Sequence, residues 1–296
     1  MKHIVLAIAL FLTPAPILAQ SQTEVDKGYL TTLIEDNLSG DAREVNIVGF
    51  QGALSSAASI DSLTISDVDG IWLTLEDIVL DWNRIALLRG TIDVNELSAK
   101  RILVARPPVS QAQAPSPEAK SFSLPDLPVG IALDTLNIEE IVLGDAFLGE
   151  ELRVSVKGNA ALSGGEGLAN IVATRLGDKV GVFNIDGSFT NTDRILALVL
   201  GIEEGPDGVA ARLLDLPGRP STKLLIEGTA PLENYGATIA LATDGQDRIQ
   251  GEFSLLSDAD GQRVKLDIGG DVTPLFAPEY QDFFGDDVQL KVDALS

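Results

Sequence analysis

Apolar side chains recur at every second position along most of this chain, a pattern typical of half-buried β-strands. Residues 70–83, GIWLTLEDIVLDWN, show it most clearly, and the phase of the alternation slips once, at Glu76–Asp77. Successive side chains of a strand point to opposite faces, so each strand has one apolar and one polar face. The slip at Glu76–Asp77 predicts a β-bulge that bends the strand.

The alternation continues almost to the C-terminal residue. It recurs near residues 92–94, 152–156, 183–185, 224–226, 239–241, 253–255, 264–268 and 288–292. The sequence therefore predicts a mainly β fold built from many half-buried strands. Residues 195–202, ILALVLGI, are apolar on both faces and are expected where the sheet is covered twice.

Helical periodicity is confined to three short segments. An apolar stripe in residues 24–39 predicts an N-terminal amphipathic helix, which either plugs the end of a groove or packs as ordinary core. Two short later helices are predicted at residues 207–216 and 273–284. The second begins with Thr-Pro and is followed by Gly285.

The N-terminal residues indicate export. Residues 1–19 combine Lys2 and His3 with a short apolar run and end in Ala19, which predicts a cleavable signal peptide and an exported protein. The alternative is a short uncleaved anchor that associates the protein with the inner membrane through residues 4–19.

One Pro- and Ser-rich stretch divides the remaining chain. Residues 107–128 are predicted to be a linker or loop between a first segment, residues 20–106, and a continuing sheet, residues 129–296. The last strand runs to the chain end without a turn or cap, so this second segment is expected to be truncated.

Composition excludes several function classes. Lys and Arg number 21 against 44 Asp and Glu, a net charge of −23, which repels nucleic acid. The chain has no cysteine and only one histidine, so cysteine and histidine nucleophile schemes and structural zinc sites are excluded. Adjacent acids such as Glu76 and Asp77 point to opposite faces. We expect no enzyme, metal or cofactor; a carboxylate hydrolase is the enzymatic alternative.

Residues 33–106 are similar to the N-terminal region of the TamB family, the translocation and assembly module subunit. The similarity consists of a D-x-x-G-x-W-L-x-L core at Asp67–Leu75, then L-x-W at Leu80–Trp82, A-L-L-x-G at Ala86–Gly90 and a second strand with L-x-A at Val94–Ala99. The later stretches LLDLPGRP, LATDGQ and GGDVTPLFAPEYQDFFG also resemble alphaproteobacterial TamB proteins.

The resemblance implies a non-enzymatic periplasmic protein that links the inner and outer membranes. It also implies the fold: a long, curved, open β-sheet of the groove or β-taco type, similar to bridge-like lipid-transfer proteins. Its implied partners are phospholipid acyl chains and the outer-membrane barrel TamA. Its implied functions are phospholipid transport along an apolar β-groove and the assembly and secretion of outer-membrane proteins such as autotransporters. Family members are several-fold longer, and the domain that meets the barrel has no counterpart here, so no residue is assigned to TamA.

The candidate lipid-groove residues are the apolar side chains of the most family-like strands: Leu73, Leu75, Ile78, Leu80, Trp82, Ile92 and Val94. Trp72 and Trp82 are either core anchors or lipid contacts, and the sequence leaves both open. The alternative function is a structural or chaperone-like β module that holds strands of outer-membrane proteins at its exposed edge without transporting lipid.

Overall fold

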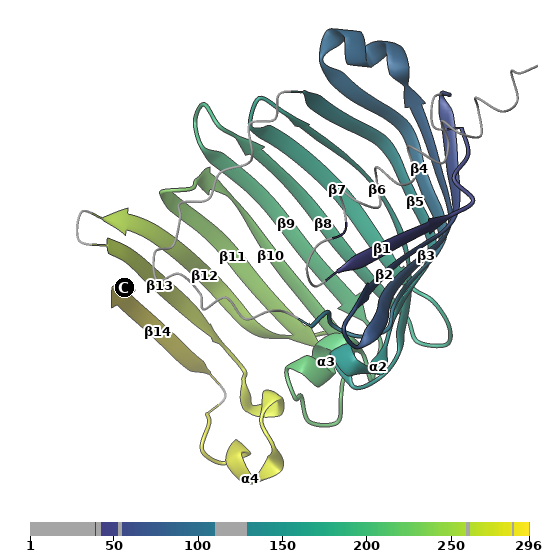
Figure 1. Ribbon diagram of the computed structural model, residues 1–296. Coiled ribbons are helices and arrows are strands. Elements are labelled where there is room, and N and C mark those ends of the chain that lie inside the picture. Colours follow the sequence, from purple (N-terminus) through teal and green to yellow (C-terminus); the bar gives the residue numbers. More distant parts are fainter. Residues whose placement is uncertain are drawn as a thin grey trace, which may run out of the picture.

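The alternating segments form one open sheet. The computed structural model describes Ser39 and residues 43–52, 55–109, 129–258, 261–285 and 287–295. In these residues, 14 strands pair in chain order, and the edge strands β1 and β14 each pair with one neighbour (Figure 1). The predicted mainly β, open sheet is confirmed.

The strands are 5 to 14 residues long. They are β1 Glu44–Val48, β2 Ala57–Asp67, β3 Gly70–Asn83, β4 Thr91–Val104, β5 Gly130–Leu143, β6 Leu152–Ser163, β7 Glu166–Arg175, β8 Gly181–Thr190, β9 Ile195–Glu204, β10 Thr222–Pro231, β11 Asn234–Thr243, β12 Gln246–Asp258, β13 Gly261–Gly270 and β14 Val288–Leu295.

Neighbouring strands are antiparallel except β4 and β5, which are parallel, with Thr91 opposite Gly130. Parallel neighbours require a crossover connection, here residues 105–129. The predicted linker lies within this crossover, and the sheet continues across it. Of the linker, only residues 107–109 are among the described residues, and they have no regular structure.

The helices are short and lie at the ends of the strands. They are the 3-10 helices η1 Arg84–Arg89 and η2 Thr273–Leu275, and the α-helices α2 Asp145–Leu148, α3 Val209–Leu213 and α4 Pro278–Gln281. Figure 1 shows α2, α3 and α4 at one end of the strands and η1 at the other. We call the first end the helical rim.

The two predicted later helices are present but shorter than expected. Helix α3 lies within residues 207–216, and residues 273–284 divide into η2 and α4. Neither α2 nor η1 was predicted. The predicted N-terminal helix, apart from Ser39, and the predicted signal peptide lie outside the described residues. In the described part of the chain, no helix has the length and apolar character needed to span a bilayer.

Pairing in register aligns apolar side chains into rows that run across the strands. One row joins 13 strands: Ala58, Leu80, Leu97, Leu136, Gly158, Ile171, Ile185, Leu200, Ile226, Ile239, Gly251, Ile268 and Leu290. Directly opposed residues share a face, so one face of the sheet is apolar from β2 to β14.

The predicted β-bulge at Glu76–Asp77 is wrong. Residues on both sides of this pair keep one register, with Ile60 opposite Ile78 and Ser62 opposite Glu76. The phase slips because Asp77 has φ 51°, a left-handed conformation that interrupts the regular pleat. Register shifts occur elsewhere in β3, near Trp72 and Trp82.

The sequence analysis expected residues 195–202 to be covered on both faces of the sheet. This expectation is also wrong for the described residues. They form most of β9, which pairs with β8 and β10 in the middle of the sheet; helix α3 contacts β9 at its last residue, Glu204, which lies outside residues 195–202. On the polar face, Val199 lies between Asp186 and Glu227 instead of under a second apolar layer.

Candidate functional site

The seven candidate lipid-groove residues share the apolar face. Five lie on β3, and Ile92 and Val94 lie on the adjacent β4. Leu75 and Ile78 are three residues apart on β3, but the rows that they belong to are two residues apart on β6. There the row of Leu75 contains Val154 and the row of Ile78 contains Val156. Positions two apart in a regular strand lie on one face, so the phase slips leave the apolar face continuous.

Among the described elements, only α2 and α3 cover part of this apolar face: at the helical rim, Val209 and Leu148 pack on Leu152 and Val154, and the face away from the rim has no second layer. Each strand packs mainly against its two neighbours, and six of the seven candidate residues are only half-buried; Val94 is buried. Exposing apolar surface costs about 25 cal/mol per Å². A continuous face of this kind therefore favours an apolar cover.

The middle of the face is hollowed because its side chains are small. The row of Trp82 continues through Ala160, Ala169 and Gly187. An apolar hollow of about 250 Å³ lies there, lined on this face mainly by Leu162, Gly167, Ala169, Gly187, Phe189 and Leu196. Gly187 leaves open space: a Cβ at this position would meet nothing closer than 3.8 Å.

Trp82 combines an apolar contact with a satisfied polar group. Its ring is half-buried, and its Nε1–H donates a hydrogen bond to the carbonyl of Ser55 at 3.0 Å. A buried or half-buried indole needs such an acceptor. The bond fixes the ring at the η1 end of the apolar face, which is compatible with either role considered for this residue.

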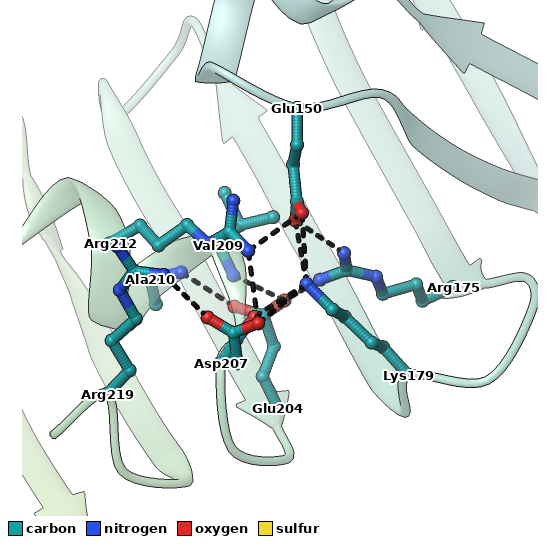
Figure 2. A network of polar contacts seen from close by, with 9 residues as sticks. All are labelled: Glu150, Arg175, Lys179, Glu204, Asp207, Val209, Ala210, Arg212 and Arg219. Carbon is teal, nitrogen blue, oxygen red and sulfur yellow. Dashed lines mark hydrogen bonds and ion pairs between the residues drawn. The ribbon is translucent and has the colours of Figure 1, made fainter.

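A network of charged side chains fastens the helical rim beside α3 (Figure 2). Its centre is the fully buried carboxylate of Glu204, the last residue of β9. Glu204 accepts hydrogen bonds from the backbone N–H of Val209 at 3.0 Å and of Ala210 at 2.7 Å, and from Arg175 at 3.3 Å. The carboxylate thus holds the start of α3 against the sheet.

The outer part of the network joins three connections. Glu150, after α2, pairs with Arg175, Lys179 and Arg212, and Asp207, before α3, pairs with Lys179, Arg212 and Arg219. In total, four cations face three carboxylates. Because every charge has partners, the network acts as a structural clamp.

The same contacts explain the pKa values in the network. Hydrogen bonds from Lys179, Arg219 and Arg212 hold the pKa of the Asp207 carboxyl well below its usual range. Burial opposes ionisation of Glu150, but hydrogen bonds from Lys179 and Arg175 outweigh it and lower the pKa. Both groups are therefore carboxylates at neutral pH.

A second ionic contact fastens the crossover. Arg106 donates to both carboxylate oxygens of Asp67, at 2.6 and 2.9 Å, and to the carbonyl of Gly70 at 2.9 Å. Hydrogen bonds from Arg106 and from the backbone of Val109 lower the pKa of Asp67 far below its usual range. Asp67 and Gly70 begin the family-like D-x-x-G segment, so this motif forms a turn that binds the start of the crossover.

Comparisons with models of protein families, with curated proteins and with solved structures found no match to this chain. The resemblance to TamB stays a prediction.

The sequence analysis assigned candidate residues to only two strands of the apolar face. It missed that the face extends over many more strands. The candidate residues stop at β4, whereas the aligned rows reach β14. The signal was present as alternation in the later strands, but the lateral alignment depends on register. The charged network on the helical rim was also missed, because its members are spread over residues 150–219.

Proposed function

We propose that this chain is an exported, TamB-like component that carries phospholipid acyl chains along the apolar face of its sheet. The observation that carries the proposal is the unbroken set of apolar rows from β2 to β14, most of whose side chains are half-exposed away from the helical rim. Acyl chains need no hydrogen-bond partners, and the face offers aliphatic side chains almost alone. The seven candidate residues form the β3–β4 part of this path.

We also propose that the sheet curves into a groove. Register shifts between β2 and β3, β3 and β4, β5 and β6, and β11 and β12 support it, because bulges bend and twist strands. Export to the periplasm, association with the inner membrane and partnership with TamA rest on residues 1–19 and the family resemblance. They remain part of the proposal.

The test is lipid content after purification. We expect Leu80→Asp, which places a charge on the apolar face, to remove most co-purifying phospholipid measured by mass spectrometry. Val79→Asp is the matched control, because Val79 is the neighbouring residue, 43% exposed on the polar face. Gly187→Leu, which fills the hollow without adding charge, should also reduce lipid content.

Equal lipid content in the wild-type protein, Leu80→Asp and Gly187→Leu would contradict the proposal. One observation favours the alternative chaperone-like function: in the described residues, β14 pairs only with β13, and Leu290 and Leu295 are exposed there. Lipid-free protein that still binds an outer-membrane strand peptide would support the alternative.

A further inference from the structure

The connection between β3 and β4 presents two aliphatic side chains to solvent, at the end of the strands opposite the helical rim (Figure 1). This connection is the 3-10 helix η1, Arg84–Arg89, which we call the η1 tip. Ile85 is 65% exposed and Leu88 is 87% exposed. Side chains three residues apart are aligned along a 3-10 helix, so these two form a single apolar patch.

The backbone of the η1 tip is fixed at both ends. At its start, Oδ1 of Asn83 accepts a hydrogen bond from the backbone N–H of Ile85 at 3.2 Å, and Ala86 is buried. At its end, Gly90 has φ 74°, and its carbonyl accepts a hydrogen bond from the backbone N–H of Gly130 at 2.8 Å. A fixed backbone lowers the conformational entropy that is lost on binding, so the patch is prepared for a partner.

Two exposed arginines, Arg84 and Arg89, frame the patch, and residues 84–92 contain no Asp or Glu. Arg89 makes no ion pair with any residue that the structure describes. A guanidinium group binds phosphate oxygens in a bidentate manner, and its aliphatic stem tolerates apolar surroundings. Aliphatic side chains beside guanidinium groups therefore match the boundary between the phosphates and the acyl chains of a phospholipid bilayer.

The η1 tip also adjoins the apolar face of the sheet. The candidate groove residues Trp82 and Ile92 lie just before and just after it in the chain. Tryptophan is enriched where a membrane meets water, because its ring is apolar while its N–H needs an acceptor, and Trp82 has one in the carbonyl of Ser55. A bilayer at the tip would thus lie next to the β3–β4 part of the path proposed for acyl chains.

The charge of the whole chain selects the kind of bilayer. At a net charge of −23 the protein is repelled by an anionic surface, whereas zwitterionic phospholipids offer phosphate groups without net charge. We propose that the η1 tip docks on a zwitterionic phospholipid bilayer, with Ile85 and Leu88 among the acyl chains and Arg89 on the phosphates. The choice of a lipid partner rests on the proposed function, in which the adjoining face accepts acyl chains.

Fluorescence quenching by vesicles of phosphatidylcholine brominated in its acyl chains tests the insertion. Because the chain has no cysteine, a fluorophore can be attached to a single introduced one. In the full chain, we expect the vesicles to quench a fluorophore on Ile85→Cys. A fluorophore on Leu213→Cys is the matched control: Leu213 is 67% exposed on α3, at the opposite end of the strands, and this fluorophore should not be quenched.

The two kinds of contact are then tested separately in the labelled Ile85→Cys chain. Leu88→Ser should lower the equilibrium constant for quenching at least about tenfold, because the most exposed aliphatic side chain of the tip no longer leaves water. Arg89→Gln should lower it by a smaller factor, since one guanidinium contact with phosphate is lost. Leu213→Ser in the same labelled chain should leave it unchanged. All three side chains are exposed, so none of the substitutions removes core packing.

Three results would overturn the proposal: equal quenching at positions 85 and 213, quenching that Leu88→Ser leaves unchanged, and self-association without quenching that Leu88→Ser abolishes, which would assign the tip to a second copy of the chain. In each case, phospholipid that still co-purifies with the wild-type protein would leave the proposed function intact. Conversely, quenching confined to position 85 in a protein that purifies without phospholipid would support the docking and contradict the proposed function.

Discussion

At the scale of single residues, Glu204 shows how this sheet holds a helix at its end. Its side chain is completely buried and satisfies two backbone N–H groups of α3 together with the guanidinium of Arg175, which is itself buried. Removing one partner of a buried ion pair leaves the other charge without compensation. Glu204 is therefore the most sensitive charged residue of the helical rim.

We expect Glu204→Ala to lower the free energy of opening of β9 and β10 by about 3–5 kcal/mol, because Arg175 and the N–H groups of α3 lose their acceptor. Amide hydrogen exchange of these strands measures it. Glu203→Ala is the control: this neighbour is 72% exposed, lies 3.6 Å from Lys223, and its loss should cost less than about 1 kcal/mol. Equal effects of the two substitutions would contradict the role given to Glu204.

At the scale of elements, glycines on the apolar face allow neighbouring strands to approach closely. A Cβ at Gly251 would lie 2.1 Å from the carbonyl oxygen of Asp267 and 2.6 Å from the Cα of Ile268, both on β13. These are backbone atoms, so they cannot rotate away. Gly187 on β8 also lies on the apolar face, but the space around it is open.

We expect Gly251→Ala to lower the free energy of opening of β12 and β13 by about 1–3 kcal/mol, since the added methyl group forces the two strands apart. The matched substitution, Gly187→Ala, should be neutral or slightly stabilising, because Ala loses less conformational entropy than Gly on folding. Hydrogen exchange of β12 and β13 measures the effect of Gly251→Ala, and exchange of β8 and its neighbours β7 and β9 measures that of Gly187→Ala. A tolerated Gly251→Ala would show that the sheet adjusts its strand spacing freely.

The strands themselves were predictable, but their lateral relations were not. Alternation is local, so segments such as residues 152–156 and 264–268 were identified from the sequence alone. The left-handed conformation of Asp77 produces the same phase slip as a bulge, so the sequence could not separate them. The parallel pairing of β4 with β5 depends on contacts across the crossover and leaves no periodic signal.

Short helices at strand ends were only partly predictable for a similar reason. Helix α3 has an apolar run and a Pro-Gly stop, whereas α2 is a single turn without a side-chain cap. The position of α3 depends on Glu204, five residues before its first turn, and that contact requires the folded β9. The extent of the candidate site was underestimated for a similar reason. Its apolar residues form continuous rows only through the register of strand pairing, which the sequence does not reveal.

At the scale of the whole molecule, the sheet resembles a repeat protein in its connectivity. Strands follow one another in order, and most contacts join neighbouring strands. The exceptions are the crossover between β4 and β5 and the helical rim, where Glu150 pairs with Arg212 and Val209 packs on Leu152 and Val154. The stability of such an array is approximately a sum of local terms and nearest-neighbour terms. A stable apolar face from β2 to β14 can therefore coexist with local opening at any one of these strands.

This connectivity predicts that damage stays local. In Gly251→Ala protein, we expect faster amide exchange in β11 to β14 and unchanged exchange in β3 to β5, because the described elements that pack closely against β11 to β14 differ from those that pack closely against β3 to β5. Exchange in Glu204→Ala protein should rise in β7 to β10, with both flanks less affected. A globally cooperative fold would instead show the same loss of protection in every strand for each substitution. Peptide-resolved hydrogen exchange on both variants separates these outcomes, and uniform loss would contradict the nearest-neighbour description of the sheet.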